Sequence, residues 1–326
     1  LMLMKDILVS GVKPTGEIHL GNYFGAMKQF VDMQDDYESR IFLADLHAIT
    51  TIQDRDKMKR TTLDQVKSYL AIGLDPEKTT IFKQSDFAEI TELSWIFNCV
   101  STMPYLMRAH SFKDAEAKDK EINVGVFTYP LLMAADILIH DAKVVPVGKD
   151  QKQHVEISRD MARKFNTKFG ETFGEPKEYI IDSLETIPGI DGQKMSKSYE
   201  NTIPLFATRE EIQKLVMKIP TTSASVEESK DPDEAIIYQI HKLIITAEED
   251  VELRKQYING GLGWKDAKDN LIRALDNFIK PLREKYESIS DEEAIKVIQD
   301  GNKKIRPVIE KKLNEIKGKV GLIIND

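Results

Sequence analysis

The chain of 326 residues contains a single cysteine, Cys99, and this scarcity excludes several kinds of protein. One thiol cannot form a disulfide framework within the chain, a four-cysteine zinc site or an iron–sulfur cluster. We therefore expect no structural metal. The neighbours Trp95, Ile96 and Val100 predict a buried, inert thiol, which fits a reducing cytoplasm.

Long apolar runs are also missing. No stretch approaches the roughly 18 to 20 apolar residues of a membrane span. The segment Leu1 to Asp6 is too short and too soon acidic for a signal peptide. We therefore expect a cytoplasmic protein that makes no use of a membrane.

An excess of positive charge is absent as well. The formal net charge of −8 argues against a protein that coats nucleic acid indiscriminately, although it allows a local basic face. A solvated helix face balanced by Glu310 and Glu315 explains the one basic cluster equally well. That cluster contains Lys303, Lys304, Arg306, Lys311, Lys312, Lys317 and Lys319.

What the chain does contain is typical of a folded globular protein, with 41% hydrophobic and 31% charged residues. Its length exceeds the roughly 250 to 300 residues at which single hydrophobic cores stop growing, so we expect two domains. We find no internal repeat and no low-complexity segment.

Short β-branched runs alternate with helical patterns in the first half, which predicts a parallel sheet wrapped by helices. A helix over 57–72 ends before Gly73, and another over 151–165 takes Asp150 as its N-cap. The expected strands contain Ile7 to Val9, Ile41 to Ala44, Thr79 to Phe82 and Val144 to Val147.

The character changes from Asn201 onward, where helical segments such as 209–218 and 234–246 are separated by prolines and glycines. We therefore predict an α/β fold with a Rossmann-like domain over 1–199 and an all-helical domain over 200–326. An alternative is that the last helix returns to the first domain. This division places a lysine-rich loop at the mouth between the domains, where ligands commonly bind.

The lysine-rich loop, Lys194-Met195-Ser196-Lys197-Ser198, is the most informative segment of the chain. Two ammonium groups three positions apart, with two hydroxyls, suit a loop that neutralises a polyphosphate. A solvated basic turn is the alternative for the pentapeptide alone.

A second segment, Ser10 to Asn22, joins the first strand to a helix. Gly21 lets a ligand approach the backbone at the helix start, while His19 and Asn22 offer donors to phosphate oxygens. A plain helix cap is the alternative.

A third segment, Leu131 to Ile139, is apolar except for Asp136. Burying an unpaired carboxylate costs at least several kcal/mol, so Asp136 needs a donor. The donor belongs either to the fold or to a bound ligand, and in the second case the surrounding aliphatic groups form a pocket.

Two further strand ends carry polar groups. Gly148 and Lys149 precede Asp150, which either caps the following helix or adds to a site where the helix receives anions. Asp45 and His47 follow the second strand. No third ligand accompanies them, so a structural or supporting use is expected rather than a metal site.

Together these segments resemble the class I aminoacyl-tRNA synthetases over nearly the whole chain. His19-Leu20-Gly21-Asn22 is similar to the family's "HIGH" signature in its tryptophan-branch form, and residues 194–198 match the "KMSKS" signature. Residues 129–138 and 145–154 select the tryptophan branch. The resemblance implies activation of L-tryptophan with ATP to tryptophanyl-adenylate and pyrophosphate. Transfer to the 3′-terminal adenosine of tRNA(Trp) follows, with Mg²⁺ as cofactor and a homodimer as the assembly.

The resemblance also implies roles for individual residues. Asp136 accepts the indole N–H, and His19, Lys194 and Lys197 are catalytic. The remaining tryptophan contacts are Tyr129, Met133, Val145, Val147 and Gln151. The implied ATP contacts are Lys13, Pro14, Thr15, Gly21, Asn22, Gly148, Lys149, Asp150, Ile187, Lys194, Met195, Ser196, Lys197 and Ser198.

Some positions depart from the family's pattern. A Gln is common where Lys13 stands, a Glu where Lys149 stands, and an aromatic where Val9 stands. A mobile lysine of some relatives is replaced by Ala115. Its substitutes here are Lys113, Lys118 or Lys120.

Three other functions compete with this interpretation: a tyrosyl enzyme of the same class, a catalytically silent RNA-binding relative, and a small-molecule ligase of the nucleotidyl-transferring superfamily. The silent relative would lack residues such as His19 or Lys197, which are present. The apolar segment 93–107 is either a dimer contact or core. The sequence does not identify the anticodon-reading residues.

Overall fold

The computed structural model describes residues 5–117, 122–148, 151–180 and 187–324. The chain forms two compact units, which are described separately below. Unit 1 contains residues 1–16, 29–181 and 290–326, and unit 2 contains residues 17–28 and 182–289. None of the helices in the described ranges is both long and apolar enough to cross a bilayer.

Unit 1 is built on a five-stranded sheet with the order β3-β2-β1-β4-β5. All four neighbouring pairs are parallel. Four strands lie where the sequence predicts them, and β5 was not predicted because its residues are charged and only partly buried. The strands are β1 (Ile7–Val12), β2 (Glu38–Leu43), β3 (Thr79–Lys83), β4 (Val144–Val147) and β5 (Lys177–Ile180).

Helices connect these strands, because a parallel pair requires a crossover. Helix α4 begins after Asp54, whose side chain accepts a hydrogen bond from the Lys57 amide at 2.6 Å. It ends before Gly73, whose φ of +100° stops the helix. Helix α9 begins after Gln151 instead of Asp150, which lies outside the described residues. The helices from α2 to α9 are α2 (Lys28–Met33), α3 (Asp45–Ala48), α4 (Arg55–Ala71), α5 (Ala88–Val100), α6 (Met103–Leu106), α7 (His110–Ala117), α8 (Val124–Leu138) and α9 (Lys152–Phe169).

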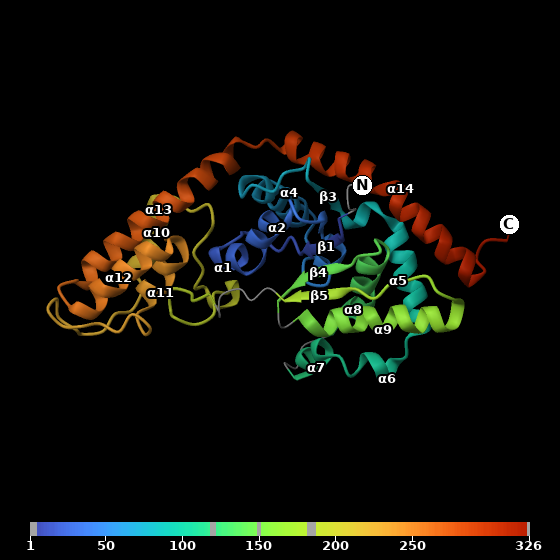
Figure 1. Cartoon of the computed structure of the whole chain (residues 1–326), viewed down its shortest axis with the longest axis horizontal. Coiled ribbons are helices and arrows are strands. Elements are labelled where there is room, and N and C mark those ends of the chain that lie inside the picture. Colours follow the sequence, from blue (N-terminus) through green and yellow to red (C-terminus); the bar gives the residue numbers. More distant parts are fainter. Residues whose placement is uncertain (1–4, 118–121, 149–150, 181–186, 325–326) are drawn as a thin grey trace. The chain divides into compact units, whose positions relative to one another are not determined.

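The core of unit 1 lies between the sheet and the helices α5, α8 and α9 (Figure 1). Helix α5 buries Leu93, Ile96 and Phe97 in this core. Cys99 is exposed, so the predicted buried thiol is wrong. Successive helical residues point about 100° apart, and Cys99 shares its open face with Trp95, which is 70% exposed.

The last helix, α14 (Asp291–Val320), belongs to unit 1 and packs against β3 (Figure 1). Its residues Ile305, Ile309 and Leu313 enter the core. Gly301 lies against the strand itself, because a Cβ added there would lie 1.7 Å from the carbonyl oxygen of Ile81. Only a residue without a side chain permits this approach.

Unit 2 contains helices as its only regular secondary structure within the described residues, which agrees with the predicted all-helical second half. Thr208 and Thr246 each form a capping box with the Glu three residues later, which starts α10 and α12. Helix α13 buries Leu271, Leu275 and Ile279. The elements are α1 (Leu20–Asn22), η1 (Tyr23–Met27), η4 (Lys197–Tyr199), α10 (Arg209–Met217), α11 (Ile236–His241), η5 (Lys242–Ile244), α12 (Ala247–Asn259) and α13 (Trp264–Ser288).

The close approach at Gly301 generates a stability prediction. Gly301→Ala must displace α14 from the backbone of Ile81, so we expect the free energy of unfolding to fall by about 1 to 3 kcal/mol. Gly318→Ala in the same helix is the control, since nothing lies within 4 Å of its added Cβ. The control should be neutral or stabilising by up to roughly 1 kcal/mol. Urea unfolding followed by circular dichroism measures both, and equal effects would contradict the packing argument.

Candidate active site in two parts

The predicted site residues fall into both units, and each part has its own geometry. Unit 1 holds Lys13, Pro14, Thr15, Tyr129, Met133, Asp136, Val145, Val147, Gly148 and Gln151. Unit 2 holds His19, Gly21, Asn22, Ile187, Lys194, Met195, Ser196, Lys197 and Ser198. Lys149 and Asp150 lie outside the described residues, as do Lys118 and Lys120. Lys113 lies exposed on α7.

The centre of the unit 1 part is Asp136 on α8, which is 1% exposed. The fold supplies its donors. His47 Nε2 lies 2.8 Å from Oδ2, and Gln84 Nε2 lies 2.7 Å from Oδ1 and 2.9 Å from Oδ2. An ionised carboxylate only accepts hydrogen bonds, so His47 donates from Nε2–H to it. The sequence left open whether the donor to Asp136 belongs to the fold or to a ligand, and the structure shows that the fold supplies donors.

The carboxylate also retains capacity for a ligand. Its two oxygens together offer about four acceptor positions, and Oδ1 accepts one hydrogen bond from the described part of the chain. Burial raises the pKa of Asp136, and the hydrogen bonds from His47 and Gln84 oppose that rise. These donors favour the charged form that a ligand N–H would bind.

The residues near Asp136 along the chain divide into apolar and polar sets. Val145 and Val147 are buried on β4, and Met133 is partly buried on α8 against the core. Tyr129 lies one helical turn before Met133. The unit 1 residues of the predicted site therefore include aliphatic and thioether groups as well as one carboxylate.

A chain of polar contacts runs from Tyr129 to the start of α9. The Tyr129 hydroxyl lies 3.0 Å from His154 Nε2, and His154 Nδ1 lies 2.7 Å from Gln151 Oε1. Since Oε1 accepts, His154 donates from Nδ1–H, and its Nε2 accepts from the hydroxyl. His154 thus orients Tyr129 and Gln151, two of the tryptophan contacts that the resemblance implies.

Lys13 follows β1 and places its ammonium 5.4 Å from the centre of the Tyr129 ring. Lys13 as a whole residue is exposed. Its ammonium group is nevertheless partly surrounded by protein, and this burial lowers the pKa of Lys13. Its cation therefore lies over an aromatic face beside the contacts just described.

The unit 2 part joins the two signature segments. The amide of Gly21 donates to the sulfur of Met195 at 3.3 Å. A Cβ on Gly21 would lie 2.9 Å from His19 Nδ1 and 3.3 Å from the Met195 Cβ, so glycine is required for this approach. Two backbone hydrogen bonds stabilise the same junction: the Leu20 amide donates to the Ile203 carbonyl, and the Leu205 amide donates to the Ile18 carbonyl.

The lysine-rich loop buries one side chain, that of Met195, between two exposed lysines. Met195 is buried, and its amide donates to the carbonyl of Ile187 at 2.8 Å. Lys194 and Lys197 on either side are exposed. The methionine therefore anchors the loop between two exposed lysines.

Asn201, which the sequence analysis missed, braces this loop from inside. It is 1% exposed, accepts from the Ser196 amide at 2.8 Å and donates to the Lys194 carbonyl at 3.1 Å. Gly189 makes space for it, since a Cβ there would lie 2.3 Å from the Asn201 side chain. No sequence pattern we used would have selected Asn201.

Gln84 and His154 were missed as well, and their signal was positional. Gln84 follows the end of β3, and His154 lies in the first turn of α9 after β4. Carboxyl ends of parallel strands carry ligands, so a search of every strand end would have found them. His47 was expected to have a structural or supporting use, and the structure makes it a partner of Asp136.

His19 is buried at the start of α1, and its Nδ1 has no hydrogen-bond partner within the described residues. Burial, with a smaller contribution from the charge of Lys197, lowers the pKa of His19 to about 4. The imidazole is therefore neutral at pH 7. An anion that approached it would both pair with Nδ1 as a donor and favour the charged form.

The comparisons with known proteins agree with these motifs. The family described as tRNA synthetases class I (W and Y) matches residues 5–280. A tryptophan–tRNA ligase of Fusobacterium nucleatum is 45% identical over 320 residues, covering 97% of this chain and 98% of that protein. One of Rhodopirellula baltica is 41% identical and covers 97% and 99%. The crystal structure of the Campylobacter jejuni tryptophanyl-tRNA synthetase complexed with ADP and tryptophan has a TM-score of 0.90 and 39% identity. It covers 97% and 99% of the two chains.

The low pKa of His19 can be tested by NMR titration of the histidines. We expect a midpoint near 4 for His19. Lys197→Met should raise that midpoint only partway toward the ordinary value, because burial is the larger cause. The His241 pKa is also lowered by burial but without a contribution from Lys197, so its midpoint should not move. A His19 midpoint near 6.5 would contradict this account of its environment.

Proposed function

The chain belongs to the class I tRNA synthetases of the tryptophan and tyrosine branch, and from this premise we propose that it is a tryptophan–tRNA ligase. It activates L-tryptophan with ATP, forms tryptophanyl-adenylate and pyrophosphate, and transfers tryptophan to the 3′-terminal adenosine of tRNA(Trp). The relatives named above as tryptophan–tRNA ligases support this substrate over nearly their full length.

The observation that carries the choice of amino acid is the buried Asp136 carboxylate beside apolar groups. Its free acceptor position suits the indole N–H, the one polar group of the tryptophan ring. Met133, Val145 and Val147 surround the rest of the ring. Phenylalanine would leave this position unpaired, and such sites reject the wrong amino acid by about 10⁴ to 10⁵. We therefore propose that the enzyme has no editing activity.

The tryptophan ammonium group is bound by Tyr129 and Gln151. His154 holds both side chains through its two ring nitrogens, which fixes the positions of their oxygens. This arrangement fixes the amino acid at both ends and leaves its carboxylate to react. Such fixed placement supplies much of the acceleration in reactions of two substrates.

In adenylate formation, a carboxylate oxygen of tryptophan attacks the α-phosphorus of ATP. The bond from that phosphorus to the bridging oxygen breaks, and pyrophosphate leaves with the electron pair. His19, Lys194 and Lys197 stabilise the charge that grows on the phosphates. In the second step, a hydroxyl of the terminal adenosine attacks the activated carbonyl, and AMP leaves.

The remaining ATP contacts are proposed from the motif positions. They are Lys13, Pro14, Thr15, Gly21, Asn22, Gly148, Lys149, Asp150, Ile187, Met195, Ser196 and Ser198. Within the described residues, no group of three or more His, Cys, Asp or Glu side chains is arranged to hold a metal ion. Mg²⁺ bound together with ATP would lower the negative charge of the phosphates.

Further proposals concern partners and domains. Residues 1–199 carry catalysis, and 200–326 recognise the anticodon, apart from the last helix. The protein is a cytoplasmic homodimer. Support for a protein contact comes from the segment 93–107, where Trp95, Met103 and Met107 are 70%, 61% and 48% exposed. Exposed apolar groups of this size favour burial by a partner.

Amino-acid-dependent exchange of pyrophosphate into ATP tests the proposed function. We expect exchange with tryptophan and none above background with tyrosine at equal concentration, because the wall at Met133 offers the tyrosine hydroxyl no partner. Charging of tRNA(Trp) should follow. Exchange with tyrosine alone would assign the chain to the tyrosyl enzymes, and no exchange with any amino acid would indicate a silent relative.

Replacing Asp136 tests its contact with the indole ring. Asp136→Ala should lower kcat/KM for tryptophan roughly ten- to hundredfold, the loss expected for a hydrogen bond to a charged group, while the KM for ATP stays unchanged. The analogue with sulfur in place of the indole N–H should lose little on the same substitution. Equal losses for both substrates would remove Asp136 from the ring contact.

A further inference from the structure

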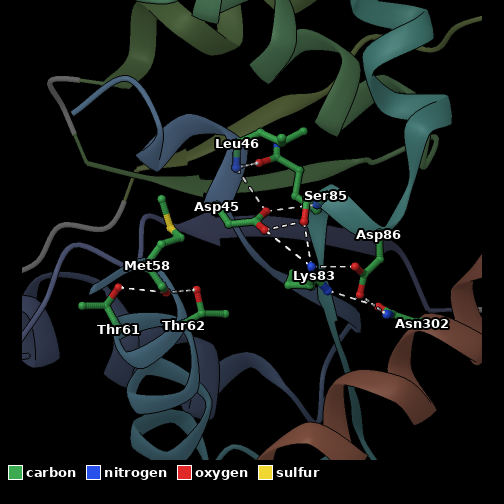
Figure 2. A network of polar contacts seen from close by, with 10 residues as sticks. Asp45, Leu46, Met58, Thr61, Thr62, Lys83, Ser85, Asp86 and Asn302 are labelled. Carbon is green, nitrogen blue, oxygen red and sulfur yellow. Dashed lines mark hydrogen bonds and ion pairs between the residues drawn. The ribbon is translucent and has the colours of Figure 1, made fainter. Parts of the chain in front are cut away.

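The C-terminal helix α14 contacts the short turn η2 (Gln84–Asp86) that carries one of the Asp136 partners. The side chain of Asn302 spans this turn. Its Oδ1 accepts from the Lys83 amide at 3.2 Å, and its Nδ2 donates to Asp86 Oδ2 at 2.6 Å (Figure 2). One amide therefore holds the residue before the turn and the last residue within it.

A second contact from the same helix supports the turn. Arg306 donates from Nη2 to the Asp86 carbonyl at 2.9 Å, and its guanidinium lies 4.7 Å from the centre of the Phe87 ring. Gly301, immediately before Asn302, permits the close approach to β3 described above. The helix face at 301–306 is thus fitted to the backbone of β3 and η2.

Polar contacts also connect η2 to the start of α3 (Figure 2). Lys83 Nζ lies 2.6 Å from Asp86 Oδ1 and 3.8 Å from Asp45 Oδ2. The Ser85 amide donates to Asp45 Oδ1 at 3.0 Å, and Ser85 Oγ donates to Asp45 Oδ2. The carboxylate of Asp45 therefore joins β3, η2 and α3.

This network surrounds both donors of Asp136. Gln84 lies between Lys83 and Ser85, and its Oε1 accepts from the Leu46 amide at 3.1 Å while its Nε2 donates to Asp136. His47 is the residue after Leu46. Freedom of η2 would let the Gln84 amide rotate away from Asp136, and a shift of α3 would move His47 as well.

We propose that Asn302 is a positioning residue for amino acid selection, acting through η2 on the orientation of Asp136. This inference rests on the proposed function, in which Asp136 accepts the indole N–H. Asn302 contacts no substrate. Its role is to fix Gln84, so that the free acceptor position of Asp136 points at the ring nitrogen instead of at a second donor of the fold.

The test is Asn302→Ala, assayed by pyrophosphate exchange with tryptophan and with the sulfur analogue that lacks the ring N–H. We expect kcat/KM for tryptophan to fall by about five- to tenfold, with the ATP KM and the analogue changed less than about twofold. The preference for tryptophan over the analogue therefore narrows, which general loss of packing would not produce.

Lys312→Met is the matched control on the same helix. Lys312 is buried and holds α14 through Asp141 at 2.9 Å and the Thr172 carbonyl at 2.7 Å, away from η2. Methionine retains the apolar length of the side chain. We expect a lower urea midpoint from this variant but an unchanged preference for tryptophan over the analogue.

A paired exchange tests the hydrogen bonds themselves and covers a failure of Asn302→Ala to fold. Asn302→Asp combined with Asp86→Asn reverses donor and acceptor between the two side chains, and the aspartate can still accept from the Lys83 amide. The pair should recover the preference that Asn302→Asp alone loses.

The outcomes separate the two proposals. A wild-type enzyme that fails to exchange with tryptophan contradicts the proposed function. An active wild type with unchanged preference in Asn302→Ala, or an equal change in Lys312→Met, overturns the role of Asn302 alone.

Discussion

A carboxylate inside an apolar helix cannot remain charged without donors, and this constraint organises unit 1. Asp136 obtains its donors from His47 and Gln84, which follow two different strands. Each donor must itself be held in place, because rotation of the amide or the imidazole would break its hydrogen bond to the Asp136 carboxylate. The bonds around Asp45, Lys83 and Asn302 supply that support.

The unit 2 part follows a different principle, in which exposed cationic side chains extend from a loop whose backbone is held in place. Lys194 and Lys197 are exposed, yet the loop backbone beneath them is held by Met195 and Asn201. The Met195 sulfur accepts from Gly21, so the two signature segments share one support. In the proposed function, this held backbone positions both ammonium groups for the phosphates, which lowers the cost of ordering the loop when ATP binds.

Much of the fold follows from local patterns. Four strands and the two helices predicted among them, α4 and α9, lie within a few residues of the predicted ranges, because β-branched runs and helical spacing reflect burial directly. The misses have physical causes. The strand β5 was missed because it carries charged residues and is only half-buried. The burial of Cys99 was wrongly predicted because its side chain points away from the helix face that its apolar neighbours share.

The sequence by itself determined the chemistry: which residue types are present, the two signatures, and an acid in an apolar helix that demanded a partner. Only the tertiary structure decided which residues donate hydrogen bonds to this acid and which residues hold those donors in place. Gln84 is 52 positions from Asp136, and Asn302 is 216 positions from Asp86. Hydrogen bonds form over a few ångströms of space, and chain separation carries no information about them until the strands and helices have packed.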